Sequence, residues 1–111
     1  MSWETICTIS DLPPNTGVAA LVNGVQIAIF RAGDEVYALN NYCPFAKANV
    51  ISRGIIGDLG GELCVASPIY KQHYTLNTGQ CLEDETVKLP RYEVRLTGDK
   101  VEISTNAVQA A

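Results

Sequence analysis

Histidine, basic residues and long apolar runs are all scarce in this chain of 111 residues. It has 1 histidine, and its 8 lysine and arginine residues stand against 12 aspartate and glutamate residues, a formal net charge of −4. This balance disfavours nucleic acid and anionic membrane surfaces as partners. No apolar run approaches the ~20 residues of a membrane span, and residues 1–4 lack the basic and apolar parts of a signal peptide. We therefore expect a cytoplasmic protein that binds neither nucleic acid nor a membrane.

The 4 cysteines include no pair at the Cys-x-x-Cys spacing, which removes the usual signature of zinc sites and redox dithiols. Apolar residues make up 47% of the chain, enough to form a core without a disulfide framework. We expect Cys7, Cys64 and Cys81 to be reduced, inert thiols.

What is present is the pattern of antiparallel β-structure. Asn23-Gly24 separates the apolar segments 17–22 and 25–30, which is the strongest two-residue hairpin signal. Apolar and polar residues alternate over 92–96 and 100–103 around Thr97-Gly98-Asp99. Helical patterns are short, at 10–12 and 46–53. The sequence therefore predicts a single all-β domain over residues 1–104, followed by a flexible tail over 105–111.

The alternation breaks between Leu39 and Thr75, where we expect function to lie. This region holds the segments 41–45 (Asn-Tyr-Cys-Pro-Phe) and 66–70 (Ala-Ser-Pro-Ile-Tyr). Together with 74–82 and 89–95, they resemble a Rieske iron–sulfur domain: two loops, a strand, a Thr-Gly turn and a closing hairpin. The resemblance implies an antiparallel β-sandwich or barrel of the Rieske [2Fe-2S] ferredoxin type, with a loop-rich cluster-type subdomain over about 40–76.

The four ligand positions do not carry Rieske ligands. A Rieske centre needs Cys-x-His and Cys-x-x-His, so that two thiolates hold one iron and two imidazoles the other. Here the positions are Cys43, Phe45, Ser67 and Tyr70. A phenyl ring cannot coordinate iron, and a hydroxyl is a hard, weakly acidic ligand. We therefore expect no metal, cofactor or catalytic residue on this chain, although a residual metal or redox role for Cys43 stays open.

A chain without the cluster needs another way to hold the two loops. Phe45, Ile69 and Tyr70 are the apolar and aromatic candidates in these loops. Packed together they would hold the loops closed, since burying each contributes on the order of 1.5–3 kcal/mol. Left exposed, they would form an apolar patch for a partner.

More closely, the segments 25–31, 52–54, 61–63, 65–68 and 81–85 resemble the NirD family of small subunits of assimilatory NAD(P)H-dependent nitrite reductases. The likeness runs from Trp3 to about Ile103 and includes the ligand losses. It implies a subunit without catalytic activity of its own, in an enzyme that reduces nitrite to ammonium. Its partner would be a large subunit that carries FAD, an iron–sulfur cluster and sirohaem. The alternatives, a stand-alone Rieske-type electron carrier and a dioxygenase ferredoxin, both need the cluster.

The two loops also supply the expected partner-binding surface, because Rieske loop tips face the electron partner. Cations stand here among apolar residues on an acidic protein, which favours a negative partner surface. The expected set is Phe45, Lys47, Arg53, Lys71, Gln72 and His73. In the alternative, these cations are merely solvated and docking uses a sheet face. For His73 itself, a surface imidazole beside Lys71 is expected.

Overall fold

The computed structural model describes residues 3–22, 24–32, 35–69 and 72–108, with side chains up to Ser104. The described backbone consists of strands joined by turns and loops, with two short 3-10 turns, η1 (Ile9–Asp11) and η2 (Ile51–Arg53). The strands are β1 (Trp3–Thr8), β2 (Gly17–Val22), β3 (Val25–Ala32), β4 (Glu35–Asn40), β5 (Tyr42–Cys43), β6 (Ala48–Asn49), β7 (Ile55–Leu59), β8 (Glu62–Ala66), β9 (His73–Thr75), β10 (Arg91–Thr97) and β11 (Lys100–Val108). The all-β class is confirmed, and no described helix has the length and apolar character to cross a membrane.

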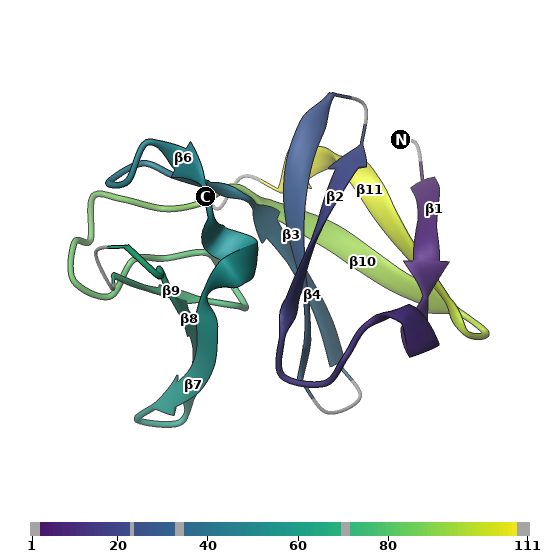
Figure 1. The fold of residues 1–111 in the computed structure, drawn as a ribbon, viewed down its shortest axis with the longest axis horizontal. Helices are drawn as coiled ribbons and strands as arrows, with labels where there is room; N and C mark the ends of the chain where they lie inside the picture. Colours follow the sequence, from purple (N-terminus) through teal and green to yellow (C-terminus); the bar gives the residue numbers. More distant parts are fainter. Residues whose placement is uncertain (1–2, 23, 33–34, 70–71, 109–111) are drawn as a thin grey trace.

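Six antiparallel strands form the larger sheet, in the order β1-β11-β10-β4-β3-β2 (Figure 1). Its edge strands β1 and β2 contact each other, so the sheet curls into a barrel. Val22 pairs with Val25 across the predicted turn, where Gly24 has a φ of 82° and Asn23 lies outside the described residues. The predicted hairpin near the C-terminus closes at Thr97 and Lys100.

The smaller lobe contains the β5–β6 pair and the sheet β7-β8-β9, on the side of the molecule away from β1 (Figure 1). The helical turns predicted over 46–53 are mostly wrong, because Ala48 and Asn49 pair with β5 and only Ile51–Arg53 turns. The core beneath the loops also includes Cys81 and Leu89, which follow the expected end of the loop subdomain near residue 76.

β3 separates the two cores, because it is buried on both faces. Ile27 and Ile29 belong to the core enclosed by the six-stranded sheet, and Ala28 and Phe30 belong to the core beneath the loops. A strand with both faces covered has a continuous apolar run, as β3 has from Ile27 to Phe30. The loop lobe is therefore attached to the barrel through a shared wall.

The last strand runs further than the sequence indicated. β11 continues to Val108, which pairs with Arg91, while Ala107 pairs with Tyr92. Residues 105–108, which we expected to belong to the tail, are therefore part of β11. Small polar residues at 105–106 interrupt the apolar pattern, so the sequence did not indicate a strand there. In the structure, two additional residues of β11 are accommodated by a register shift opposite β10. Residues 109–111 lie outside the described part.

Candidate functional site

The two loops that carry the ligand positions meet in the structure. Cys43 ends β5 and Ser67 follows β8, and the Cys43 Sγ atom lies 3.6 Å from the Ser67 Oγ atom. The same sulfur lies 3.6 Å from the hydroxyl oxygen of Tyr74 in β9. All three side chains are buried. Two of the four ligand positions are thus brought together.

The surroundings of Cys43 favour its thiolate. Burial raises the pKa of the Cys43 thiol, but hydrogen bonds from the Ala46 backbone, Ser67, Tyr74 and the Phe45 backbone outweigh burial and leave the pKa below its usual value. Burial, followed by the hydrogen bond with Cys43, raises the pKa of Tyr74. The tyrosine hydroxyl therefore keeps its proton beside the sulfur.

This donor set does not fit a [2Fe-2S] cluster. It offers one thiol and one aliphatic hydroxyl, where the cluster needs two thiolates and two imidazoles. Phe45 supplies only carbon, and Tyr70 lies outside the described residues. Within the part of the chain that the structure describes, no group of three His, Cys, Asp or Glu side chains is placed to hold a metal ion.

The loops are held by different means. Phe45 is half-buried and packs against the core beneath the loops, whereas Ile69 is 49% exposed. The second loop is closed by its backbone, because the Ser67 N–H donates to the Gln72 carbonyl at 2.8 Å. The Gln72 Oε1 atom is buried and accepts no hydrogen bond from a described residue. Of the two expected arrangements, Phe45 therefore packs on the core, whereas Ile69 is left exposed.

His73 is not the simple surface imidazole expected beside Lys71. Its Nδ1 atom lies 2.6 Å from the Glu83 Oε2 atom, and its backbone N–H donates to Oε1 of the same carboxylate at 2.7 Å. Burial raises the pKa of Glu83, but the hydrogen bonds from the His73 backbone and ring outweigh it and lower the pKa. The contact ties the loop after β9 to the start of that strand.

A cavity of about 340 Å³ opens beside Ser67. Its described lining residues are Arg53, Ile55, Ala66, Ser67, Pro68 and His73. Ile55 pairs with Ala66, and Ala66 pairs with His73, so these three form one row across β7, β8 and β9. The Arg53 side chain is exposed and has no hydrogen-bond or ion-pair partner among the described residues. The cavity thus combines an apolar floor with a free guanidinium.

This cavity unites only part of the expected partner-binding set. Arg53 and His73 line it, whereas Phe45 and Lys47 belong to the turn between β5 and β6. Lys47 is exposed, with a φ of 54° that few non-glycine residues adopt. Lys71 lies outside the described residues.

Comparison with known proteins agrees with this geometry. The Rieske-like [2Fe-2S] domain family matches residues 2–104. The chain is 46% identical over 103 residues to a nitrite reductase (NADH) small subunit from Salmonella typhimurium, covering 91% of this chain and 95% of that protein. The NMR structure of NirD from Escherichia coli is 44% identical, with a TM-score of 0.85 over 92% of this chain and 94% of that one.

The chain belongs to the Rieske-like domain family, among the nitrite reductase small subunits.

Family membership explains why the loops keep a Rieske layout around a donor set that cannot hold the cluster. Another relative shows a different arrangement of the same domain. A nitrite reductase [NAD(P)H] large subunit from Klebsiella oxytoca is 39% identical over 108 residues, which cover 97% of this chain but 11% of that protein. There, a segment similar to this whole chain is part of the large polypeptide.

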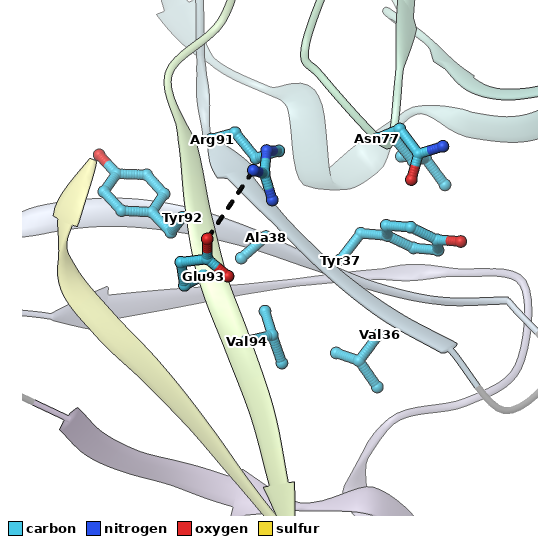
Figure 2. A pocket seen from close by; sticks show the side chains of 9 residues that line it. Val36, Tyr37, Ala38, Asn77, Arg91, Tyr92, Glu93 and Val94 are labelled. Carbon is cyan, nitrogen blue, oxygen red and sulfur yellow. Dashed lines mark ion pairs between the residues drawn. The ribbon is translucent and has the colours of Figure 1, made fainter. Parts of the chain in front are cut away.

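A second cavity, of about 130 Å³, lies where β4 and β10 separate (Figure 2). These strands pair only at Leu39 with Arg91 and at Ala38 with Tyr92. An Arg91 guanidinium nitrogen lies 3.9 Å from the Glu93 Oε1 atom across its rim. Because these charges offset each other, the cavity has no single sign with which to select an ion.

Sequence reasoning missed three residues that organise the site: Asn41, Tyr74 and Glu83. Asn41 is buried, and its Oδ1 atom accepts from the Ser52 N–H at 2.7 Å while its Nδ2 atom donates to the Gln26 Oε1 atom at 3.2 Å. An asparagine just after a strand is ordinarily read as a turn residue. Tyr74 and Glu83 act on residues 31 and 10 positions away, so no local pattern indicates their partners.

Proposed function

We propose that this chain is the small subunit of an NAD(P)H-dependent nitrite reductase, which reduces nitrite to ammonium in nitrite and nitrate assimilation. The observation that carries the proposal is 46% identity, over 91% of the chain, to a NADH nitrite reductase small subunit. The chain acts within this oxidoreductase by docking on the catalytic large subunit. It performs no catalytic step itself.

In this proposal the large subunit holds the FAD, the iron–sulfur cluster and the sirohaem, and the complex works in the cytoplasm. Hydride acceptance and nitrite reduction are cofactor chemistry. On this chain, the thiol of Cys43 and the hydroxyls of Ser67 and Tyr74 are the groups that converge where the Rieske layout would place a cluster. They support a subunit whose contribution is structural.

The proposed docking surface comprises the two loops, with Phe45, Lys47, Arg53, Lys71, Gln72 and His73. Its support is the guanidinium of Arg53, which has no partner among the described residues and lines an apolar cavity on a protein with a net charge of −4. The His73 contact with Glu83 reduces the contribution of His73, because a carboxylate already lies against its ring.

The alternative is a stand-alone Rieske-type electron carrier. That function requires two thiolates and two imidazoles at the loop tips. Cys43 and Ser67 do not provide this set, and Phe45 cannot contribute to it. We therefore prefer the subunit.

Two measurements test the proposal. A tagged chain should copurify with the nitrite reductase large subunit of its own organism, and its loss should lower nitrite-dependent NAD(P)H oxidation. The isolated chain, purified without oxygen, should be colourless. Stoichiometric iron and acid-labile sulfide in the isolated chain would instead establish the electron carrier.

A further inference from the structure

β7 is an edge strand with one side unpaired among the described residues, because the small sheet has the order β7-β8-β9. Leu59 pairs with Glu62 around Gly60 and Gly61, whose φ angles of 62° and 89° define a type I′ turn. The pair that flanks such a turn exchanges both backbone hydrogen bonds, and successive pairs alternate. The N–H and C=O groups of Ile56 and Asp58 therefore point away from β8.

Hydrogen bonds on the other side of β8 agree with this alternation. The carbonyl of Leu63, opposite Asp58, accepts from the Leu76 N–H at 2.9 Å, on the β9 side. Ser67 lies four residues after Leu63, so its backbone groups face the same side as those of Leu63. Its N–H donates to the Gln72 carbonyl on that side. The outward groups of β7 are thus two donors and two acceptors that no described residue binds.

β7 also lacks the features that usually protect an exposed edge. Its sequence, Ile-Ile-Gly-Asp-Leu, has neither lysine nor proline, and its register with β8 has no bulge. The one charge, on Asp58, is turned into the hairpin, where its Oδ1 atom accepts from the Gly61 N–H at 2.8 Å. The edge is therefore open to another strand.

The face beside this edge is apolar. Ile55 is 76% exposed and Leu59 is 46% exposed, and both lie on the same face because they are four residues apart in a strand. Between them, Gly57 leaves space, since a Cβ atom there would have no neighbour within 4 Å. Ile55 also lines the cavity with the free guanidinium of Arg53. Edge, apolar face and cavity form one continuous surface.

We propose that an extended segment of the nitrite reductase large subunit adds to this sheet as a strand beside β7. One of its apolar side chains packs on Ile55, and a carboxylate of the same segment pairs with Arg53. Main-chain hydrogen bonds supply affinity in such strand addition, and side-chain pockets supply specificity. This inference rests on the proposed function, which provides the large subunit as partner.

Two observations favour this occupant. The Arg53 guanidinium favours an anionic partner group, because its planar set of N–H donors can form two parallel hydrogen bonds with a carboxylate. In the Klebsiella oxytoca relative, the matching domain is part of the large chain itself. In that relative the shared polypeptide keeps the domain beside the rest of the large chain, which favours the large chain as the partner of this domain.

Amide hydrogen exchange at residue level, in the free chain and in the complex with the large subunit, tests the strand addition directly. In the free chain, the amides of Ile56 and Asp58 should exchange fast, and those of Gly57 and Leu59 slowly. In the complex, Ile56 and Asp58 should slow by about tenfold or more, because each gains a hydrogen bond.

Variants supply the second test. The double variant Ile55→Lys and Leu59→Lys should weaken binding of the large subunit by about tenfold or more, and Arg53→Glu should do the same. Leu21→Lys is the matched control, since Leu21 is 72% exposed on β2, in the other sheet. All variants change exposed side chains, and thermal unfolding would verify that they fold.

The outcomes separate the two proposals. If the large subunit does not bind the wild-type chain, the proposed function fails, and the strand addition fails with it. If it binds but the amides of Ile56 and Asp58 stay fast, or the lysine variants bind normally, docking uses another surface and only this inference is overturned. Concentration-dependent protection of those amides in the free chain would assign the edge to a second copy of this chain, and would also overturn it.

Discussion

The two cores of this molecule differ in chemistry. The core enclosed by the six-stranded sheet consists of aliphatic side chains and one tyrosine, Tyr92. The core beneath the loops includes the two thiols of Cys43 and Cys81 and the hydroxyl of Tyr74. Among the buried polar residues, Asn41, Ser67 and Thr75 lie in the loop lobe, and Ser104 lies on β11 of the larger sheet.

This difference indicates how the loop lobe is stabilised without a metal. In a Rieske domain, a cluster links the two loops covalently. Here the link is a set of hydrogen bonds that converge on Cys43, together with the buried ring of Tyr74. Such a polar core depends on the satisfaction of each donor and acceptor, whereas an aliphatic core depends mainly on volume.

Tyr74→Ala should give the largest loss of stability, because it removes a fully buried ring and a partner of Cys43 together. Loss of a buried aromatic side chain costs about 3–5 kcal/mol. Urea unfolding followed by circular dichroism measures the change. Tyr42→Ala, at a residue that is 43% exposed, is the control and should cost far less. Equal effects would mean that the loop lobe contributes little to the cooperative fold.

Asn41→Ala should come next, because Asn41 joins the Ser52 backbone of the loop lobe to Gln26 on β3. Its removal leaves the Ser52 N–H without its acceptor, and an unsatisfied group of this kind costs about 1–3 kcal/mol. The matched control is Asn77→Ala, since Asn77 is exposed. Unfolding midpoints would show the difference. A loss no greater than that of the control would contradict the role of polar groups in this lobe.

These contrasts also explain what the sequence could predict. The barrel hairpins follow from Asn23-Gly24 and Gly98, since turn chemistry and period-two alternation are local. The strand at 105–108 was missed because Thr105 and Asn106 interrupt the apolar pattern, and its pairing depends on distant β10. The placement of the two loops followed from family resemblance alone.

The candidate site was predictable only where residue type decides the chemistry. The residue types of Phe45 and Ser67 alone exclude a complete set of ligands for a [2Fe-2S] cluster. The convergence of Tyr74 on Cys43 and the pairing of Glu83 with His73 depend on tertiary structure, and composition offers no signal for either. The open edge of β7 follows from strand order, which is likewise a tertiary property.

Glu83→Gln should have a smaller and pH-dependent effect. Contacts with His73 lower the pKa of Glu83 in the folded state, whereas an unfolded glutamate has a pKa of about 4.3. The contribution is therefore complete above the unfolded value and is lost as the pH falls through the folded one. Because the side chain is 46% exposed, solvent screens the pair and we expect at most ~1 kcal/mol.

Unfolding free energies of both proteins between neutral pH and about pH 3 test this dependence. The difference between wild type and variant should shrink towards the acid end. Glu85→Gln, two residues along, is a control because the Glu85 side chain makes no hydrogen bond or ion pair with a described residue. A difference that grows on acidification would reverse the assigned sign.

Cys43→Ser should have the smallest effect, and on activity none. A serine hydroxyl can keep the hydrogen bonds with Ser67 and Tyr74, so we expect a stability change under ~1 kcal/mol. Nitrite-dependent NAD(P)H oxidation by the complex should be unchanged, because no group of metal-ligating side chains surrounds the sulfur among the described residues. A large loss of activity, with unchanged stability and unchanged association with the large subunit, would instead assign redox or metal chemistry to the sulfur. It would also show that the hydrogen bonds around Cys43 serve to activate a thiolate and not merely to hold the loops.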